Sequence, residues 1–160
     1  MITQKRVVEL FDYSDGVFIW KKDTFNTMAG DIAGGLNRAS GYWTIGVDGV
    51  RYLLHRLIYL YHNGDVPRCL DHIDCDPTNN KIENLRPTTH SQNQCNTKLR
   101  SDNKSGIKGV NWREDIRKYR TYVTVKGKRM LLGNFVDINE AEKVVRDARV
   151  KYHGPFANHG

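Results

Sequence analysis

Cysteine is scarce in this chain of 160 residues, which has only Cys69, Cys75 and Cys95. The number is odd and no two of the cysteines form a CxxC pair. These two facts argue against a disulfide framework and against a four-cysteine zinc clip. We therefore expect three reduced thiols.

Long hydrophobic runs are also absent from the sequence. No apolar stretch approaches the roughly 20 residues that span a bilayer, and the opening segment from Met1 to Arg6 lacks the apolar core of a secretory leader. The glycines at positions 30, 34 and 35 are not followed by the Gly-Lys-Ser/Thr of a phosphate-binding loop. We expect an intracellular protein with no membrane partner and with one or two small domains.

The net charge of +7 is concentrated in one part of the chain. Residues 1–54 hold six basic and six acidic side chains, and residues 55–100 hold six and five. Residues 101–160 hold thirteen basic and seven acidic side chains. A basic block of this kind suits a polyanion such as DNA or RNA, although charge alone does not exclude a merely soluble surface.

Hydrophobic periodicity predicts an α+β fold. Residues 7–11 have a short helical pattern, residues 16–20 and 42–54 are strand-like, and Asp48-Gly49 is typical of a hairpin turn. A helix is expected from residue 54 to a stop at Asn63-Gly64. A second helix is expected after Thr89, which forms a capping-box pattern with Gln92.

Residues 98–106 are almost free of apolar side chains and are expected to be a linker. Three short strand patterns follow, and then an amphipathic helix with Asn139 as its expected N-cap and Gly154-Pro155 as its end. The expected domains are a nuclease-like part at 1–97, whose core is about 52–97, and a three-stranded antiparallel sheet packed on one helix at 107–160.

The stretch from Asp71 to Asn93 is rich in residues that suit phosphodiester hydrolysis. Asp71 and His72 are adjacent on an expected strand, so their side chains point to opposite faces. Asn84 is expected on the returning strand and Asn93 on the following helix. A neutral histidine can deprotonate water near pH 7, and Asp and Asn oxygens suit Mg²⁺ or Mn²⁺ better than zinc.

This stretch resembles the HNH homing endonucleases of phages and mobile introns, which have a ββα-metal fold. The residues that carry the resemblance are Leu54-His55-Arg56-Leu57, Asp71-His72-Ile73-Asp74, Asn79-Asn80, Ile82-Glu83-Asn84-Leu85-Arg86 and Ser91-Gln92-Asn93. The resemblance implies that His72 is the general base and that Asp71 and Asn93 hold Mg²⁺ or Mn²⁺. It also implies that Asn84 orients the His72 ring through a hydrogen bond.

Some features of the stretch differ from the family or stay open. Asn93 stands where many members have histidine, and the cysteine pairs that hold zinc in some relatives are missing, so no structural zinc is expected. A structural role is favoured for His55 and Arg56, with phosphate contact as the alternative. Asp74 and His90 are further candidates for the metal site.

The third segment is expected to bind double-stranded DNA. In residues 119–126 the side chains alternate between a mainly apolar face and a basic, polar face formed by Arg120, Tyr122, Thr124 and Lys126. In Gly106-Ile107-Lys108-Gly109-Val110, Leu132-Gly133-Asn134-Phe135, Glu140-Ala141 and His153-Gly154-Pro155-Phe156-Ala157-Asn158, the segment resembles the ethylene-response-factor (Apetala-type) DNA-binding domain. In that family such a sheet lies in the major groove. The residues that the resemblance turns toward DNA are Lys108, Asn111, Arg113, Tyr122, Thr124, Arg129 and Leu131.

Together these features predict a metal-dependent HNH DNA endonuclease of the homing type with its own DNA-binding module. By family analogy it leaves a 5′ phosphate and a 3′ hydroxyl, acts in a phage-infected bacterial host, and needs a homodimer or two nicks to break both strands. The alternatives are a DNA-binding regulatory protein with a vestigial nuclease domain and a module directed at RNA, whose deep, narrow groove suits a sheet less well.

Overall fold

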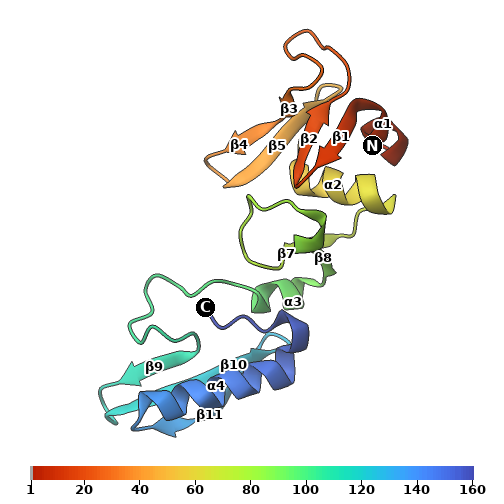
Figure 1. Ribbon diagram of the computed structural model, residues 1–160. Coiled ribbons are helices and arrows are strands. Elements are labelled where there is room, and N and C mark those ends of the chain that lie inside the picture. The colour runs from red at the N-terminus through yellow and green to blue at the C-terminus, as the bar shows by residue number, and fades with distance from the viewer. Residues whose placement is uncertain (1) are drawn as a thin grey trace. The chain divides into compact units, whose positions relative to one another are not determined.

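The computed structural model describes residues 2–160, which form two units, one ending at Thr88 and the other beginning at Thr89. The fold is α+β as expected, with four α-helices and small antiparallel sheets among the described residues (Figure 1). The position of one unit relative to the other is not determined. The three cysteines are free thiols.

The first unit contains two small sheets, two helices and a β-hairpin. Its elements are α1 (Gln4–Leu10), β1 (Phe11–Ser14), β2 (Val17–Trp20), β3 (Ile32–Ala33), β4 (Gly35–Asn37), β5 (Tyr42–Val47), β6 (Val50–Leu53), α2 (Leu54–Asn63), β7 (Cys69–His72), the 3₁₀ turn η1 (Ile82–Asn84) and β8 (Leu85–Thr88). The sheets have the orders β1-β2-β3 and β4-β5-β6, and β7 pairs with β8.

The core of the first unit forms around α2. This helix ends as expected at Gly64, which has a left-handed conformation that suits a residue without a Cβ atom. Its buried side chains include Leu54, Leu57 and Ile58, which pack with Phe11 and residues of the strands. The helix also buries His55. One side of α2 therefore packs in the core, and His55 lies against His72 of the β7–β8 hairpin.

The second unit is a three-stranded sheet covered by a long helix. Its elements are α3 (His90–Cys95), β9 (Val110–Arg113), β10 (Lys118–Val125), β11 (Lys128–Phe135), α4 (Ile138–His153) and the 3₁₀ turn η2 (Gly154–Phe156). The sheet order is β11-β10-β9, and α4 lies along it (Figure 1). The capping box of Thr89 and Gln92 at the start of α3 is confirmed.

The alternation in β10 has the expected result. Thr121 and Val123 are buried, whereas Arg120 and Tyr122 alternate with them and are only partly buried. Tyr119, on the same face as Thr121, packs against the cluster of Val110, Ala141 and Val145. The expected N-cap of the helix is wrong by two residues. Asp137 is the cap and its carboxylate accepts a hydrogen bond from the Asn139 N–H, because an aspartate offers a stronger acceptor to the first turn.

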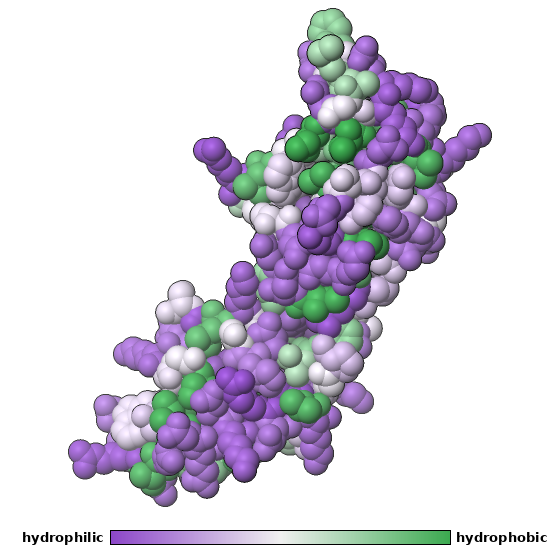
Figure 2. All heavy atoms as spheres, in the orientation of Figure 1, coloured by the Kyte–Doolittle hydropathy of each residue, from purple (hydrophilic) through white to green (hydrophobic). Residues whose placement is uncertain are grey.

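The surface in Figure 2 is mostly hydrophilic, and the hydrophobic residues on the visible face form small separate patches. None of the helices within residues 2–160 has the length and apolar content needed to cross a membrane.

Candidate active site and nucleic-acid interface

The β7–β8 hairpin places an aspartate and an arginine directly opposite each other. Asp71 pairs with Arg86 across the two strands, and its Oδ2 accepts hydrogen bonds from Arg86 Nε at 3.0 Å and Nη2 at 2.9 Å. Asp71 is only 6% exposed. The ion pair offsets the cost of burying this carboxylate, which would be several kcal/mol for an unpaired charge.

His72 follows Asp71 on β7 and contacts a different set of residues, as adjacent strand residues must. Its ring lies against His55 of α2, with the ring centroids 4.9 Å apart and the planes at 68°. Tyr42 of β5 lies beside both rings, at 5.4 Å from His55 and 6.1 Å from His72. His72 on β7 is therefore in contact with two other elements of the first unit, α2 and β5.

The side-chain amide of Asn80 determines the tautomer of the His72 ring. Asn80 Nδ2 donates to the Thr78 carbonyl at 3.2 Å, so its Oδ1 faces His72 Nε2 at 3.1 Å. Since Oδ1 can only accept, Nε2 must carry the hydrogen. The lone pair of a neutral ring is then on Nδ1, which becomes the nitrogen that can take up a proton.

The loop between β7 and β8 is organised by the carboxylate of Asp74. It accepts hydrogen bonds from the Asp76 N–H and from the side-chain amides of Asn79 and Asn84, at 2.6 to 2.9 Å. Burial alone would raise the pKa of Asp74, but these hydrogen bonds together hold it below its ordinary value. With both oxygens used inside the loop, Asp74 is better suited to shaping the loop than to binding a metal.

Asn84 lies in a different place from that expected. It ends the turn η1 instead of lying on the returning strand, and its amide group bonds with Asp74 and with the Asn79 carbonyl. The expected hydrogen bond from Asn84 to His72 is not found among the described residues, and Asn80 makes that contact. The physical reason is that η1 tightens the chain before β8 and turns Asn84 into the loop.

The hairpin between β1 and β2 supports the loop from the other side. Tyr13 OH accepts a hydrogen bond from the Ile82 N–H at 3.1 Å, and Asp15 forms an ion pair with Lys81 at 2.8 Å. Gly16 has a positive φ of 89°, and a Cβ atom there would lie 2.9 Å from the backbone nitrogen of Lys81. The loop that carries Asn80 thus depends on this N-terminal hairpin.

His55 is an unusual residue within this site. It is 5% exposed and its Nδ1 has no hydrogen-bond partner among the described residues. Burial, helped by repulsion from His72 and Arg56, lowers the pKa of His55 to about 3. His55 is therefore a neutral ring packed against His72.

The proposed metal ligands lie in different units. Asn93 is an exposed residue of α3 in the second unit, whereas Asp71 belongs to the first. Within residues 2–160 no three His, Cys, Asp or Glu side chains are grouped to hold a metal. Asp71 nevertheless suits a hard cation, because its buried carboxylate already accommodates a positive group; amide, water and phosphate oxygens would complete such a site.

The strand register places six of the predicted DNA-binding residues on one face of the second unit. Arg120 lies opposite Asn111, and Thr124 lies opposite Arg129. Directly paired residues share a face, and this face is turned away from α4. These six polar residues are Asn111, Arg113, Arg120, Tyr122, Thr124 and Arg129, and the predicted Leu131 shares the face because it lies opposite Tyr122.

Several side chains of this face are held by neighbours. Arg129 lies over the Tyr122 ring at 4.5 Å from its centroid, and the Asn111 amide donates to the Tyr122 hydroxyl. Arg120 Nε donates to Asn134 Oδ1 at 3.2 Å. The face is therefore a preformed surface of guanidinium, amide and hydroxyl groups, which are the groups that contact bases and phosphates.

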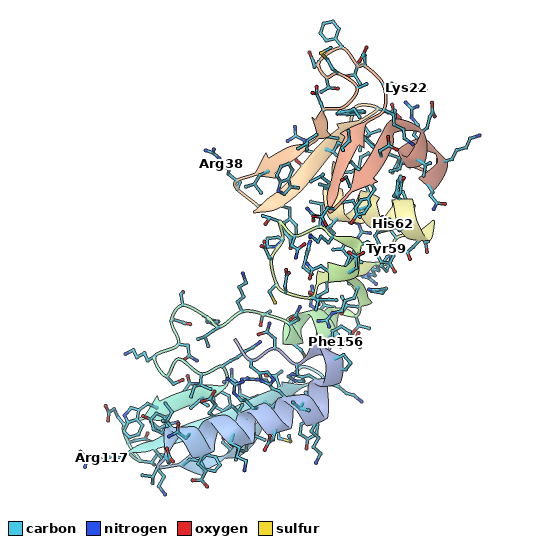
Figure 3. All side chains as sticks on the ribbon, in the orientation of Figure 1. Lys22, Arg38, Tyr59, His62, Arg117 and Phe156 are labelled. Carbon is cyan, nitrogen blue, oxygen red and sulfur yellow. The ribbon has the colours of Figure 1, made fainter. Side chains whose placement is uncertain are left out.

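The other two predicted DNA-binding residues lie outside this face. Lys126 forms the two-residue turn between β10 and β11 with Gly127. Lys108 precedes β9, and its ammonium donates to the carbonyls of Cys95 and Thr97, so it closes the end of α3. Arg117 lies at the far turn between β9 and β10 (Figure 3).

Sequence reasoning missed Asn80 as the partner of His72, and for His55 it favoured a structural role with phosphate contact as the alternative, without expecting the contact with His72. Asn80 was visible only as one of several asparagines in a polar loop, where asparagine is usually a turn residue. It also missed Tyr42, which is distant in sequence and reaches the site through the packing of β5 on α2.

Two comparisons identify similar proteins. Residues 52–95 match the HNH endonuclease family. The chain is also 34% identical over 107 residues to Protein 3.8 of Escherichia phage T7, a match that spans 64% of this chain and 86% of that protein. No solved structure matches the chain.

Proposed function

Because the chain belongs to the same family as Protein 3.8 of Escherichia phage T7 and carries an HNH endonuclease domain at residues 52–95, we propose that it is a metal-dependent endonuclease that hydrolyses DNA phosphodiester bonds. The observation that supports this best is the hairpin inside the matched region. It holds a buried carboxylate, Asp71, next to a histidine whose tautomer is set by Asn80.

In this proposal His72 is the general base. Its Nδ1 takes a proton from the attacking water, while Asn80 keeps the ring in orientation and stabilises the positive charge that develops. Asp71 and Asn93 hold a divalent cation, Mg²⁺ or Mn²⁺. When bound, the cation offsets negative charge on the scissile phosphate and on the leaving 3′ oxygen. Asn84 acts through the loop, by keeping Asp74 and Asn79 in place.

The second unit supplies DNA binding in the proposal, as an ethylene-response-factor-like module of residues 107–160 with 98–106 as the linker. Two observations support this role. The basic excess of the chain is in residues 101–160, and the strand register gathers guanidinium and amide groups on the face away from α4. A sheet of this kind can enter the major groove of B-form DNA.

The proposal also includes a homing role and a homodimer. Homing rests on the resemblance to phage and intron enzymes. The dimer rests on the chemistry, because one site per chain cuts one strand and a double-strand break needs two chains or two successive nicks.

The test is to incubate the purified full chain with duplex DNA and to map new ends on both strands. Cleavage is expected with Mg²⁺ or Mn²⁺ and is expected to stop with EDTA. His72→Ala should lower the rate at least about 100-fold, since a general base contributes that much or more, and should leave DNA affinity nearly unchanged.

The matched control is His62→Ala, which removes an exposed histidine of the same domain. It should cut at the wild-type rate. Full activity of folded His72→Ala, or cleavage that continues in EDTA, would show that the proposed chemistry is wrong. Tight DNA binding without any cleavage would favour a regulatory protein with a vestigial nuclease domain.

A further inference from the structure

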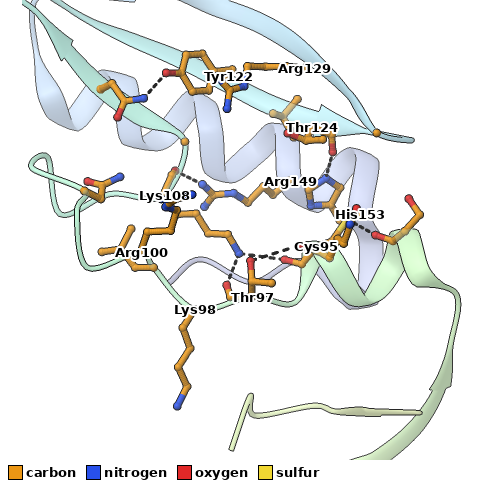
Figure 4. Close-up of a pocket in the computed structure, with 18 of the residues that line it drawn as sticks. Cys95, Thr97, Lys98, Arg100, Lys108, Tyr122, Thr124, Arg129, Arg149 and His153 are labelled. Atoms are coloured by element: carbon orange, nitrogen blue, oxygen red, sulfur yellow. Dashed lines mark hydrogen bonds between the residues drawn. The ribbon is translucent and has the colours of Figure 1, made fainter. Parts of the chain in front are cut away.

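A pocket with a strongly basic lining lies within the second unit, at the edge of β10 that β9 leaves uncovered. It has a volume of about 530 Å³ and is lined by residues of α3, the segment 97–103, the sheet and α4 (Figure 4). The cations that line it are Lys98, Arg100, Lys108, Arg129 and Arg149. Its one acidic side chain, Asp102, is already paired with Arg100 at 2.9 Å.

Arg149 is the central observation in this pocket. It comes from the sheet-facing side of α4 and is only 3% exposed. Its Nη2 donates to the Lys108 carbonyl, but its Nη1 is buried and has no hydrogen-bond partner among the described residues. No acidic partner of Arg149 is found in the described part of the chain. Burying a guanidinium without a counter-charge costs free energy unless an anion completes it.

The surroundings of Arg149 agree with this interpretation. Burial and repulsion from Arg146 lower its pKa to about 10, as expected for a cation without a counter-ion. His153 Nε2 donates a hydrogen bond to the Thr124 carbonyl, and its Nδ1 is a second buried nitrogen without a partner among the described residues. Gly109 leaves room for the guanidinium, because a Cβ atom there would lie 3.1 Å from Arg149 Nη2.

We propose that this pocket is a phosphate-binding site with the Arg149 guanidinium as its main ligand. A guanidinium and a phosphate form paired, charge-assisted hydrogen bonds. The pocket also shares Asn111, Tyr122 and Arg129 with the predicted DNA face. A backbone phosphate of bound DNA is therefore the favoured source, and this part of the inference rests on the proposed function. A free nucleotide or inorganic phosphate has the same chemistry and is distinguished by the test.

The test uses the full chain in EDTA, so that no cleavage takes place. The side-chain N–H resonances of Arg149 are followed by NMR and are assigned by their loss in Arg149→Lys. Three titrations are compared: inorganic phosphate, a short DNA duplex, and sodium chloride at matched ionic strength. We expect a saturable shift with phosphate and with the duplex, and none with chloride.

Each outcome of this titration has a defined meaning. A shift with the duplex supports a DNA phosphate in the pocket. A shift with inorganic phosphate alone supports the site with a free phosphate as its source. If neither probe shifts the Arg149 resonances, the inference is overturned. Because the phosphate titration needs neither cleavage nor DNA binding, its result stands even if the proposed function fails.

A pair of variants tests the contribution to DNA binding. Arg149→Gln should lower duplex affinity about tenfold and should reduce the slope of log K against log salt by about 0.9, the value for one phosphate contact. Lys143→Gln removes the same charge from an exposed position on α4 outside the pocket and should have little effect. Equal affinities and slopes in the two variants would contradict a DNA phosphate at Arg149. If Arg149→Gln does not fold by circular dichroism, the titration of the wild-type chain decides.

Discussion

At the scale of single residues, Asn80 determines which nitrogen of His72 carries the hydrogen. This asparagine is 3% exposed and its amide is held by the Thr78 carbonyl, so its oxygen has a fixed direction. Residues that orient a catalytic side chain in this way act through the group that they hold.

Replacing Asn80 should therefore reduce cleavage and not DNA binding. We expect Asn80→Ala to lower the cleavage rate about 10- to 100-fold, the usual cost of losing such an orienting partner. Asn80→Asp keeps an oxygen acceptor and should recover part of the rate. Single-turnover cleavage and a binding isotherm in EDTA are the measurements, and equal rates in wild type and Asn80→Ala would argue against this role.

His55 should make the stability of the first unit depend on pH. Its pKa is about 3 in the folded chain and near 6.5 in the unfolded chain. Above about pH 6.5 both states are neutral at this residue, and between pH 6.5 and 3 only the unfolded state takes up the proton. The contribution of His55 to the free energy of unfolding is therefore complete above pH 6.5, and it is lost as the pH falls toward 3.

The measurement is the free energy of unfolding in urea at pH 7 and at pH 5, for wild type and His55→Phe. Over this interval the wild type should lose up to about 2 kcal/mol more than the variant. Phenylalanine keeps a ring beside Tyr42 and His72, so the packing is largely retained. Identical losses in the two proteins would mean that His55 is protonated in the folded state.

At the scale of elements, the hairpin between β1 and β2 acts on the active site through Gly16. An alanine there meets two obstacles, the positive φ of 89° and the Lys81 nitrogen 2.9 Å from the new Cβ. Gly49 provides a matched control, since it has a φ of 76° but nothing within 4 Å of a Cβ.

Gly49→Ala should cost about 1 kcal/mol of stability from backbone strain alone and leave cleavage unchanged. Gly16→Ala should cost more, and it should also slow cleavage because the displaced Lys81 backbone moves Asn80. Thermal unfolding and the single-turnover rate measure the two effects. A Gly16→Ala protein with normal cleavage would show that the loop does not depend on this hairpin.

The elements predicted well are those set by local sequence. The end of α2 at Gly64 and the cap of α3 at Thr89 follow from the preferences of neighbouring residues, and both are confirmed. The partners of His72 could not be predicted in the same way. Tyr42 and His55 contact His72 only through tertiary packing. Asn80, and not Asn84, bonds to His72, because Asn84 ends the turn η1 and does not lie on the strand that the sequence predicted.

At the scale of the whole molecule, chemistry and DNA binding are expected to be carried by different units. Arg120→Gln changes the sheet face of the second unit and should weaken duplex binding, but cleavage at saturating DNA should stay close to the wild-type rate. His72→Ala should have the opposite effects. Lys5→Gln, at an exposed position of α1, controls for the loss of one positive charge.

The double variant with both His72→Ala and Arg120→Gln tests whether the two effects are independent. Distant, independent sites have effects that add as free energies, so the duplex affinity of the double variant should equal that of Arg120→Gln. A slower single-turnover rate for Arg120→Gln at saturating DNA would instead mean that the sheet helps to place the scissile phosphate.

For the proposed metal-dependent enzyme, the pairing of Asp71 with Arg86 also predicts how the protein responds to removal of the cation. The arginine already neutralises the carboxylate at 2.9 Å, so withdrawing a cation leaves no bare charge to push the strands apart. Chelation should therefore stop cleavage and leave the melting temperature unchanged. In the proposed enzyme an incoming ion would compete with this guanidinium for the carboxylate, so we expect weak, reversible loading that follows the metal concentration.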